Sequence, residues 1–258
     1  MTWSGWNWVA ASVRGTSHAN SGTECQDSHL CFEASADEGQ VFVALASDGA
    51  GSAKYSARGS SLICETLRDV VTEFFAERGR VDLINARLVA GWIERFRSEV
   101  ILLAEAEGSS EREFACTLLG AVLGSAAACF FQIGDGAIVY SISADGPYRL
   151  CFWPNRGDYE NTTYFATQAN FSEQLQFKLI AESAREIALF SDGLQRLALN
   201  YQAQEAHQPF FRGLFPSIRS ISPTERAEMN DQLAKFLGSS KVNERTDDDK
   251  TLILALSR

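Results

Sequence analysis

The chain has little of what marks exported, membrane-spanning or zinc-stabilised proteins. Its six cysteines include no C-x-x-C pair, so neither a disulfide framework nor a zinc site is indicated. The first ten residues lack the basic and unbroken apolar segments of a secretory signal. No run approaches the roughly 20 apolar residues that a membrane helix needs. We therefore expect a cytoplasmic protein with reduced thiols and no membrane partner.

Linkers are also scarce. Only five prolines are present, and no Gly/Ser or Pro tract divides the 258 residues, 45% of which are hydrophobic. This length and composition predict one domain over residues 1–258. The net charge of −10 repels polyanions, which argues against a nucleic-acid partner. We expect a monomer.

The apolar pattern predicts strands and helices that do not alternate regularly. Short β-branched and apolar runs indicate strands, whereas apolar residues at helical spacing indicate amphipathic helices. The expected order is strands at 6–13, 28–34 and 41–47, helices at 62–75 and 84–100, an antiparallel meander at 116–123, 126–133 and 137–143, a strand at 187–191, a helix at 224–237 and a strand at 252–256. Such an order favours an α+β fold with an antiparallel core and external helices.

Four aspartates, Asp27, Asp48, Asp192 and Asp248, stand at the ends of predicted strands. Carboxylates at strand ends can meet at the rim of a sheet, where a hard divalent cation can neutralise them. Glycine follows Asp48 and Asp192, and the Gly134–Gly136 segment repeats the Asp-Gly pair. Taken singly, each Asp-Gly pair is explained by an ordinary turn, and the acidic run 247–249 by a solvated loop. However, a predicted strand follows that run at once.

Six motifs occur in the order found in one enzyme family. They are Cys25-Gln26-Asp27, Asp48-Gly49-Ala50-Gly51, Phe114-Ala115-Cys116-Thr117, Ile133-Gly134-Asp135-Gly136, Phe190-Ser191-Asp192-Gly193-Leu194 and Asp248-Asp249-Lys250-Thr251. Together they resemble the metal-dependent protein phosphatases, the type 2C serine/threonine family. The segments Arg14–His18 and Gly157–Thr163 resemble a bacterial branch of it. The resemblance implies a four-layer αββα sandwich of two antiparallel sheets flanked by helices.

The resemblance also implies a metal site and a reaction. Asp48 would bridge two Mn²⁺ or Mg²⁺ ions, Asp27 and the Gly49 carbonyl would hold one, and Asp192 and Asp248 the other. Asp135 with Asp192 matches a looser position for a third ion. Water or hydroxide bridging the two ions would attack the phosphorus of phosphoserine or phosphothreonine directly. The implied catalytic residues are therefore Asp27, Asp48, Asp192 and Asp248.

Three positions depart from the family pattern. Gln26 replaces a glutamate that many members carry, and Ala50 replaces a histidine proposed as general acid in eukaryotic relatives. The phosphate-binding arginine of those relatives, five residues before the first aspartate, is Gly22 here. Arg14 and His18 are the nearby candidates for phosphate binding, although either could be an ordinary surface residue.

Three functions remain to be compared. The first is a phosphatase acting on phosphorylated proteins, opposed to a serine/threonine kinase. The second is a weak or inactive module of the same fold that binds phosphoproteins, motivated by Gln26 and Ala50. The third is a metal-dependent phosphodiesterase of another fold. The segment 152–178 could form a substrate-selecting flap or an ordinary surface excursion.

Overall fold

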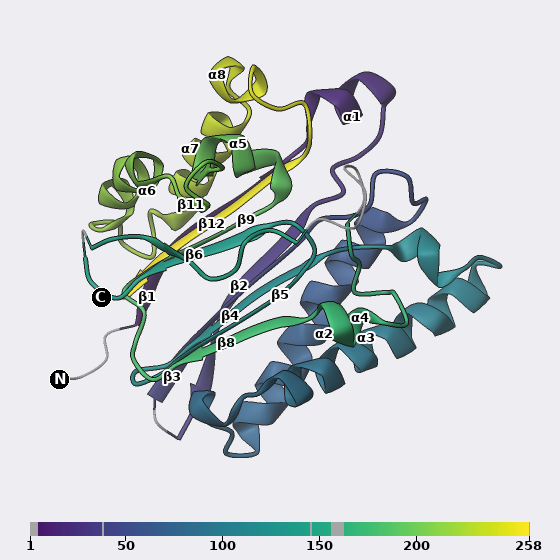
Figure 1. The fold of residues 1–258 in the computed structure, drawn as a ribbon, viewed down its shortest axis with the longest axis horizontal. Helices are drawn as coiled ribbons and strands as arrows, with labels where there is room; N and C mark the ends of the chain where they lie inside the picture. The colour runs from purple at the N-terminus through teal and green to yellow at the C-terminus, as the bar shows by residue number, and fades with distance from the viewer. Residues whose placement is uncertain (1–4, 38, 145, 156–162, 258) are drawn as a thin grey trace.

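Two five-stranded antiparallel sheets pack face to face in the computed structural model, which describes residues 5–37, 39–144, 146–155 and 163–257 (Figure 1). The first sheet has the order β1 (Trp6–Val13), β12 (Lys250–Ser257), β9 (Glu186–Phe190), β6 (Ala137–Ser141) and β7 (Arg149–Leu150). The second has the order β2 (Ser28–Ala36), β3 (Gly39–Ser47), β4 (Leu118–Leu123), β5 (Ala128–Ile133) and β8 (Gln176–Ile180). Strands close in sequence thus divide between two layers.

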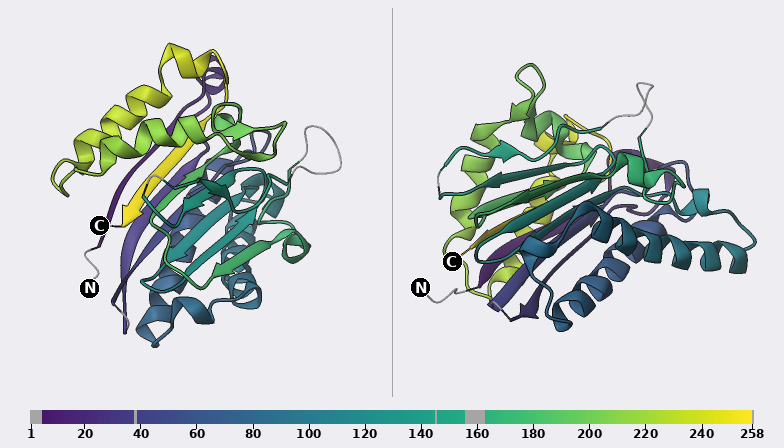
Figure 2. Two further views of the ribbon diagram at one scale, coloured as in Figure 1. Left: turned by 60° about the vertical axis from the view of Figure 1, so that its left-hand side comes forward. Right: turned by 60° about the horizontal axis from the view of Figure 1, so that its bottom comes forward.

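Helices cover the outer face of each sheet (Figure 2). The long helices α2 (Ser56–Ala76) and α3 (Ala86–Ala106) cover the second sheet, and α6 (Gln208–Leu214) and α7 (Arg226–Leu237) cover the first. The shorter elements are α1 (Thr16–Ser21), η1 (Val81–Leu83), η2 (Glu111–Phe114), α4 (Phe171–Gln174), η3 (Asp192–Leu194), α5 (Gln195–Ala198), β10 (Leu199–Asn200), β11 (Glu205–Ala206), η4 (Phe215–Ile218) and α8 (Ser240–Asn243). None of the helices described is long and apolar enough to cross a membrane.

Three apolar cores separate the four layers. Because successive side chains of a strand point to opposite faces, one strand can serve two cores. In β3, Val43 and Leu45 pack towards α2 and α3, whereas Phe42 and Ala44 pack against the other sheet. β12 alternates in the same way between the inter-sheet core and the core under α6 and α7. The predicted αββα sandwich is confirmed, and burial on both faces explains the near-continuous apolar runs.

One predicted connection is wrong. The expected meander continues from β5 into β6 within one sheet, but β6 crosses to the other sheet, where Ala137 pairs with Phe190 of β9. The crossing is made at Gly134–Gly136, with Gly134 at φ 102°, a conformation that favours glycine. The buried Gln132 amide donates to the carbonyls of Gly134 and Gly136. The sequence pattern could not reveal that β6 joins the other sheet, because the turn before β5 and the turn after it both contain glycine.

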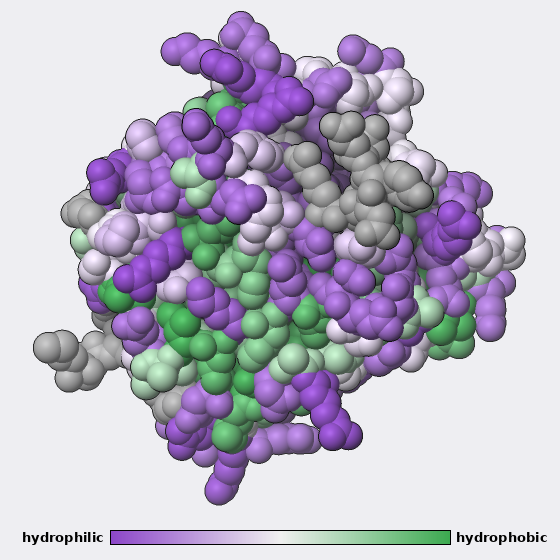
Figure 3. Space-filling model, viewed as in Figure 1, coloured by the Kyte–Doolittle hydropathy of each residue, from purple (hydrophilic) through white to green (hydrophobic). Residues whose placement is uncertain are grey.

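The segment 152–178 is partly built into the fold. Phe171 is fully buried, and residues 176–178 begin β8, which pairs with β5. The phosphatase-like stretch 157–162 lies outside the described residues. Beyond this segment, Leu179 is 39% exposed in β8. Figure 3 shows an apolar band across the lower middle of the face where Figure 1 places β8.

Candidate metal centre

Five carboxylates from separate segments meet at one rim of the sandwich. Asp27 lies just before β2, Asp48 just after β3, Asp135 between β5 and β6, Asp192 after β9 and Asp248 before β12. The Asp48 carboxylate interacts electrostatically with all four of the others. The structure therefore brings together the aspartates that the sequence analysis selected, from positions up to 221 residues apart.

Burial and mutual repulsion disfavour the charged forms of these carboxylates. Burial, reinforced by Asp249 and Asp248 and opposed by hydroxyl hydrogen bonds, raises the pKa of Asp27 to about 7. Burial together with Asp135 and Asp248 raises the pKa of Asp192 to about 8. For Asp48, burial and then Asp27 raise the pKa well above its usual range. A bound cation would neutralise the carboxylates and thereby stabilise their charged forms.

The donor set fits a hard divalent ion. Asp27 Oδ1 and Asp192 Oδ1 are buried and have no hydrogen-bond partner among the described residues, so both are available as ligands. All the converging donors are oxygens, which Mg²⁺ and Mn²⁺ prefer. In the described part of the chain, no group of three His, Cys, Asp or Glu side chains is already arranged to hold a metal ion. Ion binding would therefore draw these side chains closer together.

Two hydroxyl groups, of Ser191 just after β9 and of Thr251 in β12, position Asp27. The Ser191 hydroxyl donates to Asp27 Oδ2 at 2.7 Å, and the Thr251 backbone N–H donates to the same hydroxyl at 2.9 Å. The Thr251 side chain also bonds to Asp27 and counteracts the rise in its pKa. The Phe190-Ser191-Asp192 and Asp248–Thr251 motifs thus supply both candidate ligands and the groups that orient a third ligand.

The Asp48 loop is held by the third motif. The Asp48 N–H donates to Thr117 Oγ1 at 2.9 Å, and the Thr117 N–H donates to the Asp48 carbonyl at 2.8 Å. The Ala50 N–H donates to the Ala115 carbonyl, and Gly49 forms an isolated β-bridge with Cys116. Segment 114–117 therefore contributes the scaffold of the loop, and its side chains are not candidate ligands.

Asp249, which the sequence analysis did not select, ties the first and last motifs together. Its carboxylate is 3% exposed and accepts the N–H groups of Gly15 and Gln26, each at 2.6 Å. A Cβ on Gly15 would lie 2.3 Å from the Asp248 backbone, so the two segments can approach only because Gly15 has no side chain. With its oxygens engaged, Asp249 positions the adjacent Asp248. The only sequence signal was an aspartate where the family motif has asparagine.

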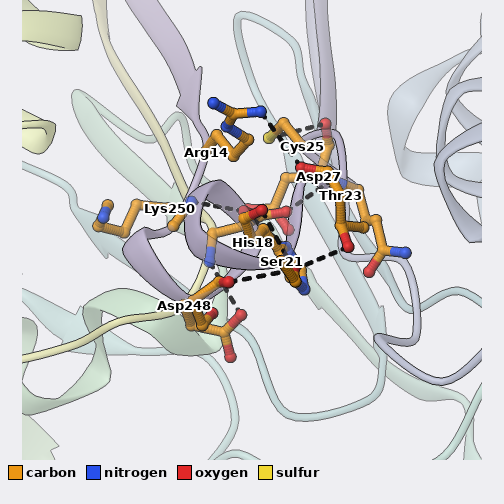
Figure 4. Close-up of polar contacts among 12 residues, drawn as sticks. Arg14, His18, Ser21, Thr23, Cys25, Asp27, Asp248 and Lys250 are labelled. Atoms are coloured by element: carbon orange, nitrogen blue, oxygen red, sulfur yellow. Dashed lines mark hydrogen bonds and ion pairs between the residues drawn. The ribbon is translucent and has the colours of Figure 1, made fainter.

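The two candidates for phosphate binding have different surroundings. Figure 4 shows His18, from α1, close to Asp248. His18 Nδ1 is 3.0 Å from Asp249 Oδ1, and the imidazole interacts electrostatically with Asp248. Arg14 is exposed, and its guanidinium donates to the Thr23 carbonyl at 3.3 Å. The geometry favours His18, and both assignments remain predictions.

The cysteine nearest the site is unsuited to act as a nucleophile. All six cysteines are free thiols. Burial, reinforced by the negative charge of Asp27, raises the pKa of Cys25 to about 12. Its reactive thiolate is therefore strongly disfavoured at neutral pH. This agrees with a mechanism in which no cysteine carries the phosphoryl group.

Comparison with known proteins identifies the family. The profile of the family described as Protein phosphatase 2C matches residues 14–238. Serine/threonine-protein phosphatase 3 of Escherichia coli (strain K12) is 34% identical over 255 residues, which cover 97% of this chain and 98% of that protein. The chain belongs to the protein phosphatase 2C family. The predicted enzyme class, serine/threonine phosphatase, is confirmed.

Solved structures confirm the fold at low sequence identity. The S. agalactiae serine/threonine phosphatase has a TM-score of 0.60, 14% identity, and coverage of 98% of this chain and 100% of that chain. Stp1 from Staphylococcus aureus has a TM-score of 0.58, 12% identity, and coverage of 99% and 95%. The catalytic domain of phosphatase PstP, solved with two manganese ions, has a TM-score of 0.58, 14% identity, and coverage of 98% of both chains.

Proposed function

We propose that this phosphatase hydrolyses phosphoserine and phosphothreonine in proteins by direct attack of water, using two Mn²⁺ or Mg²⁺ ions. The observation that carries the proposal is the convergence of five carboxylates, two of them with a buried oxygen that has no partner among the described residues. The two manganese ions in the PstP structure support the same number of ions here. Homology to enzymes favours catalysis over a pure binding module.

The ligand assignment is the one that the family resemblance implies. Asp48, which interacts with all the other carboxylates, would lie between the two ions. Asp27 and the Gly49 carbonyl would hold one ion, and Asp192 and Asp248 the other. Asp135, close to Asp192, would serve a third, weaker position. When bound, the ions supply an activated water and neutralise charge on the phosphoryl group.

Other groups of the chain keep these ligands in place. Ser191 and Thr251 orient Asp27, and Thr117 holds the Asp48 loop. Asp249 fixes the start of the chain against the closing motif through Gly15. Ligands held in this way lose less freedom when an ion binds, so a rigid supporting shell strengthens binding. His18 would face the bound phosphate ester from the side of α1.

The activity can be tested with purified protein, a synthetic phosphoserine peptide and p-nitrophenyl phosphate. We expect phosphate release with Mn²⁺ or Mg²⁺ and none after chelation with EDTA. Asp48→Asn should abolish turnover, whereas Asp82→Asn, which changes an exposed aspartate paired with Arg80, should not. Equal rates for Asp48→Asn and the unmodified protein would overturn the proposal. Preferential hydrolysis of bis(p-nitrophenyl) phosphate would favour a phosphodiesterase.

The cellular role can be tested separately. If the protein opposes a serine/threonine kinase, its deletion should raise the occupancy of phosphoserine and phosphothreonine sites, and the Asp48→Asn variant should not reverse the increase. A phosphoproteome unchanged by deletion would contradict this role. The substrates would be the proteins whose sites respond to both deletion and restoration.

A further inference from the structure

We propose that His18 donates the proton that the leaving serine or threonine oxygen requires, and that Asp249 is the positioning residue that aims it. The inference rests on the proposed phosphatase reaction and adds a catalytic residue to it. An alkoxide is a poor leaving group, and the residues directly after Asp48, Gly49 to Gly51, carry no side chain that can donate a proton to it. General acid catalysis at such a step typically contributes 10²–10⁴-fold.

The first support is the pairing of His18 with Asp249. His18 Nδ1 lies 3.0 Å from Asp249 Oδ1, and the side chains are 16% and 3% exposed. The carboxylate is itself fixed, because the N–H groups of Gly15 and Gln26 hold its two oxygens. Nδ1 makes no hydrogen bond among the described residues, so Asp249 holds the imidazole through this close contact and leaves Nε2 for another partner. The negative charge of the carboxylate also complements an imidazolium.

The second support is the direction of Nε2. A methyl group built on Gly51 would lie 3.8 Å from His18 Nε2 and 3.9 Å from Gln26 Oε1. Nε2 therefore faces the loop that carries Asp48. The space beside Gly51 is bordered by two polar groups, and Gln26 Oε1 is buried with no hydrogen-bond partner among the described residues. A small polar group of a substrate fits this position better than an apolar one.

The charged groups facing His18 are both acidic. Asp249 Oδ1 lies 3.0 Å from His18 Nδ1, and Asp248 interacts with the imidazole electrostatically. Arg14, the basic side chain nearby in the sequence, is directed to the Thr23 carbonyl. Of these two candidates, His18 is the one whose polar atom faces the Asp48 loop.

The proposed step balances as follows. The oxygen of water forms a bond to phosphorus while the bond from phosphorus to the serine oxygen breaks. The electron pair of the broken bond stays on the serine oxygen, which takes the proton from His18 Nε2. Serine leaves as a neutral alcohol, the spare proton of the attacking water passes to solvent, and neutral His18 regains a proton from solvent. One water is consumed for each alcohol and phosphate released.

A comparison of leaving groups tests the role. Single-turnover rates would be measured for His18→Gln on a phosphoserine peptide and on p-nitrophenyl phosphate, whose phenolate needs no proton to leave. We expect a loss of about 10²-fold or more on the peptide and little change on p-nitrophenyl phosphate. The second rate also reports folding and metal loading. His207→Gln, which changes an exposed histidine bonded to the Leu197 carbonyl, is the matched control and should leave both rates unchanged.

His18→Arg separates proton donation from phosphate binding. Arginine can bind phosphate but cannot give up its proton in a protein. We expect this variant to retain or improve the KM for the peptide while its single-turnover rate stays low. Full recovery of the peptide rate by His18→Arg would overturn proton donation. Equal losses on both substrates for His18→Gln would overturn it as well.

Asp249→Asn tests the positioning residue. It keeps the size of the side chain but removes the charge and one of the two acceptor oxygens. We expect a selective loss on the phosphoserine peptide that is smaller than the loss for His18→Gln, with p-nitrophenyl phosphate turnover retained at saturating Mn²⁺. A loss of the same size on both substrates at saturating Mn²⁺ would refute the positioning role. If the unmodified protein hydrolyses neither substrate, the proposed function itself fails.

Discussion

The Ser191 hydroxyl and the Asp27 carboxylate, 164 residues apart, are joined by a buried hydrogen bond of 2.7 Å. The same hydroxyl accepts the Thr251 N–H, so one side chain links three segments of the metal centre. Asp27 Oδ2 is thereby occupied, while Oδ1 has no partner among the described residues. This arrangement leaves one oxygen for an ion and fixes the direction in which it points.

Ser191→Ala should therefore weaken metal binding without preventing folding. Removal of a group that orients a ligand typically lowers metal affinity by about 10–100-fold. Mn²⁺ titration followed by calorimetry, and by activity at increasing Mn²⁺, would measure the change. Ser98→Ala is the matched control, because the exposed Ser98 hydroxyl donates to the Glu94 carbonyl within α3 and lies outside the metal centre. An affinity for Ser191→Ala equal to that of the control would show that Asp27 needs no such support.

Without metal, the protein should become less stable as the pH rises through neutrality. Asp27 and Asp192 have folded-state pKa values of about 7 and 8, above the ordinary value of 3.8. At a pH between 3.8 and these folded-state values, the folded chain holds protons that the unfolded chain has released. The stability that these protons contribute is therefore fully present below about pH 4 and is lost as the pH rises through 7–8. Melting temperatures in EDTA should fall over this range, and less steeply for Asp192→Asn.

Divalent ions should reverse that trend. Because an ion must displace the bound protons, Mn²⁺ should raise the melting temperature more at pH 8 than at pH 5.5. The Asp82→Asn protein, altered far from these carboxylates at an exposed ion pair, should show the same response as the unmodified protein. A stabilisation by Mn²⁺ that does not change with pH would contradict proton displacement.

Gly15→Ala should disrupt the centre, whereas Gly91→Ala should not. A methyl group on Gly15 would lie 2.3 Å from the Asp248 backbone, so the closing motif or α1 must move. Gly91, within α3, has nothing within 4 Å of the same position, and alanine there should stabilise the helix by roughly 1 kcal/mol. Chemical unfolding should show that Gly15→Ala lowers the stability and Gly91→Ala raises it. Mn²⁺ titration should show a loss of metal affinity for Gly15→Ala and none for Gly91→Ala. Unchanged Mn²⁺ affinity for Gly15→Ala would exclude this packing role.

Gly51→Ala tests the space between His18 and Gln26 by filling it. The added methyl meets ordinary contact distances of 3.8 and 3.9 Å and needs no backbone strain, so folding should be unaffected. We expect a lower kcat/KM on the phosphoserine peptide, since the methyl takes the position offered to a substrate group. Steady-state kinetics and a thermal melt measure the two effects. A fully active variant would place the substrate elsewhere.

The sequence alone predicted most of the strands and the four aspartates that the fold brings together. β1 lies at Trp6–Val13, as its apolar pattern indicated, and the strands containing residues 41–47 and 252–256 are longer than predicted by two or three residues. Asp27, Asp48, Asp192 and Asp248 were selectable because each follows or precedes an apolar strand. The apolar pattern of a strand and a polar residue at its end are local signals, because the burial of a strand determines residue types over only a few positions.

Contacts between distant segments were decided only by the tertiary structure. The transfer of β6 to the other sheet, the Asp249 carboxylate under Gly15 and the pairing of His18 with Asp249 leave no periodic pattern in the chain. The sequence has two adjacent aspartates, Asp248 and Asp249. Only the packing shows that Asp249 is buried with its oxygens bonded to backbone, whereas Asp248 is exposed beside the other carboxylates. That distinction depends on which segments the sheets bring together, because burial and hydrogen-bond satisfaction are properties of the whole fold.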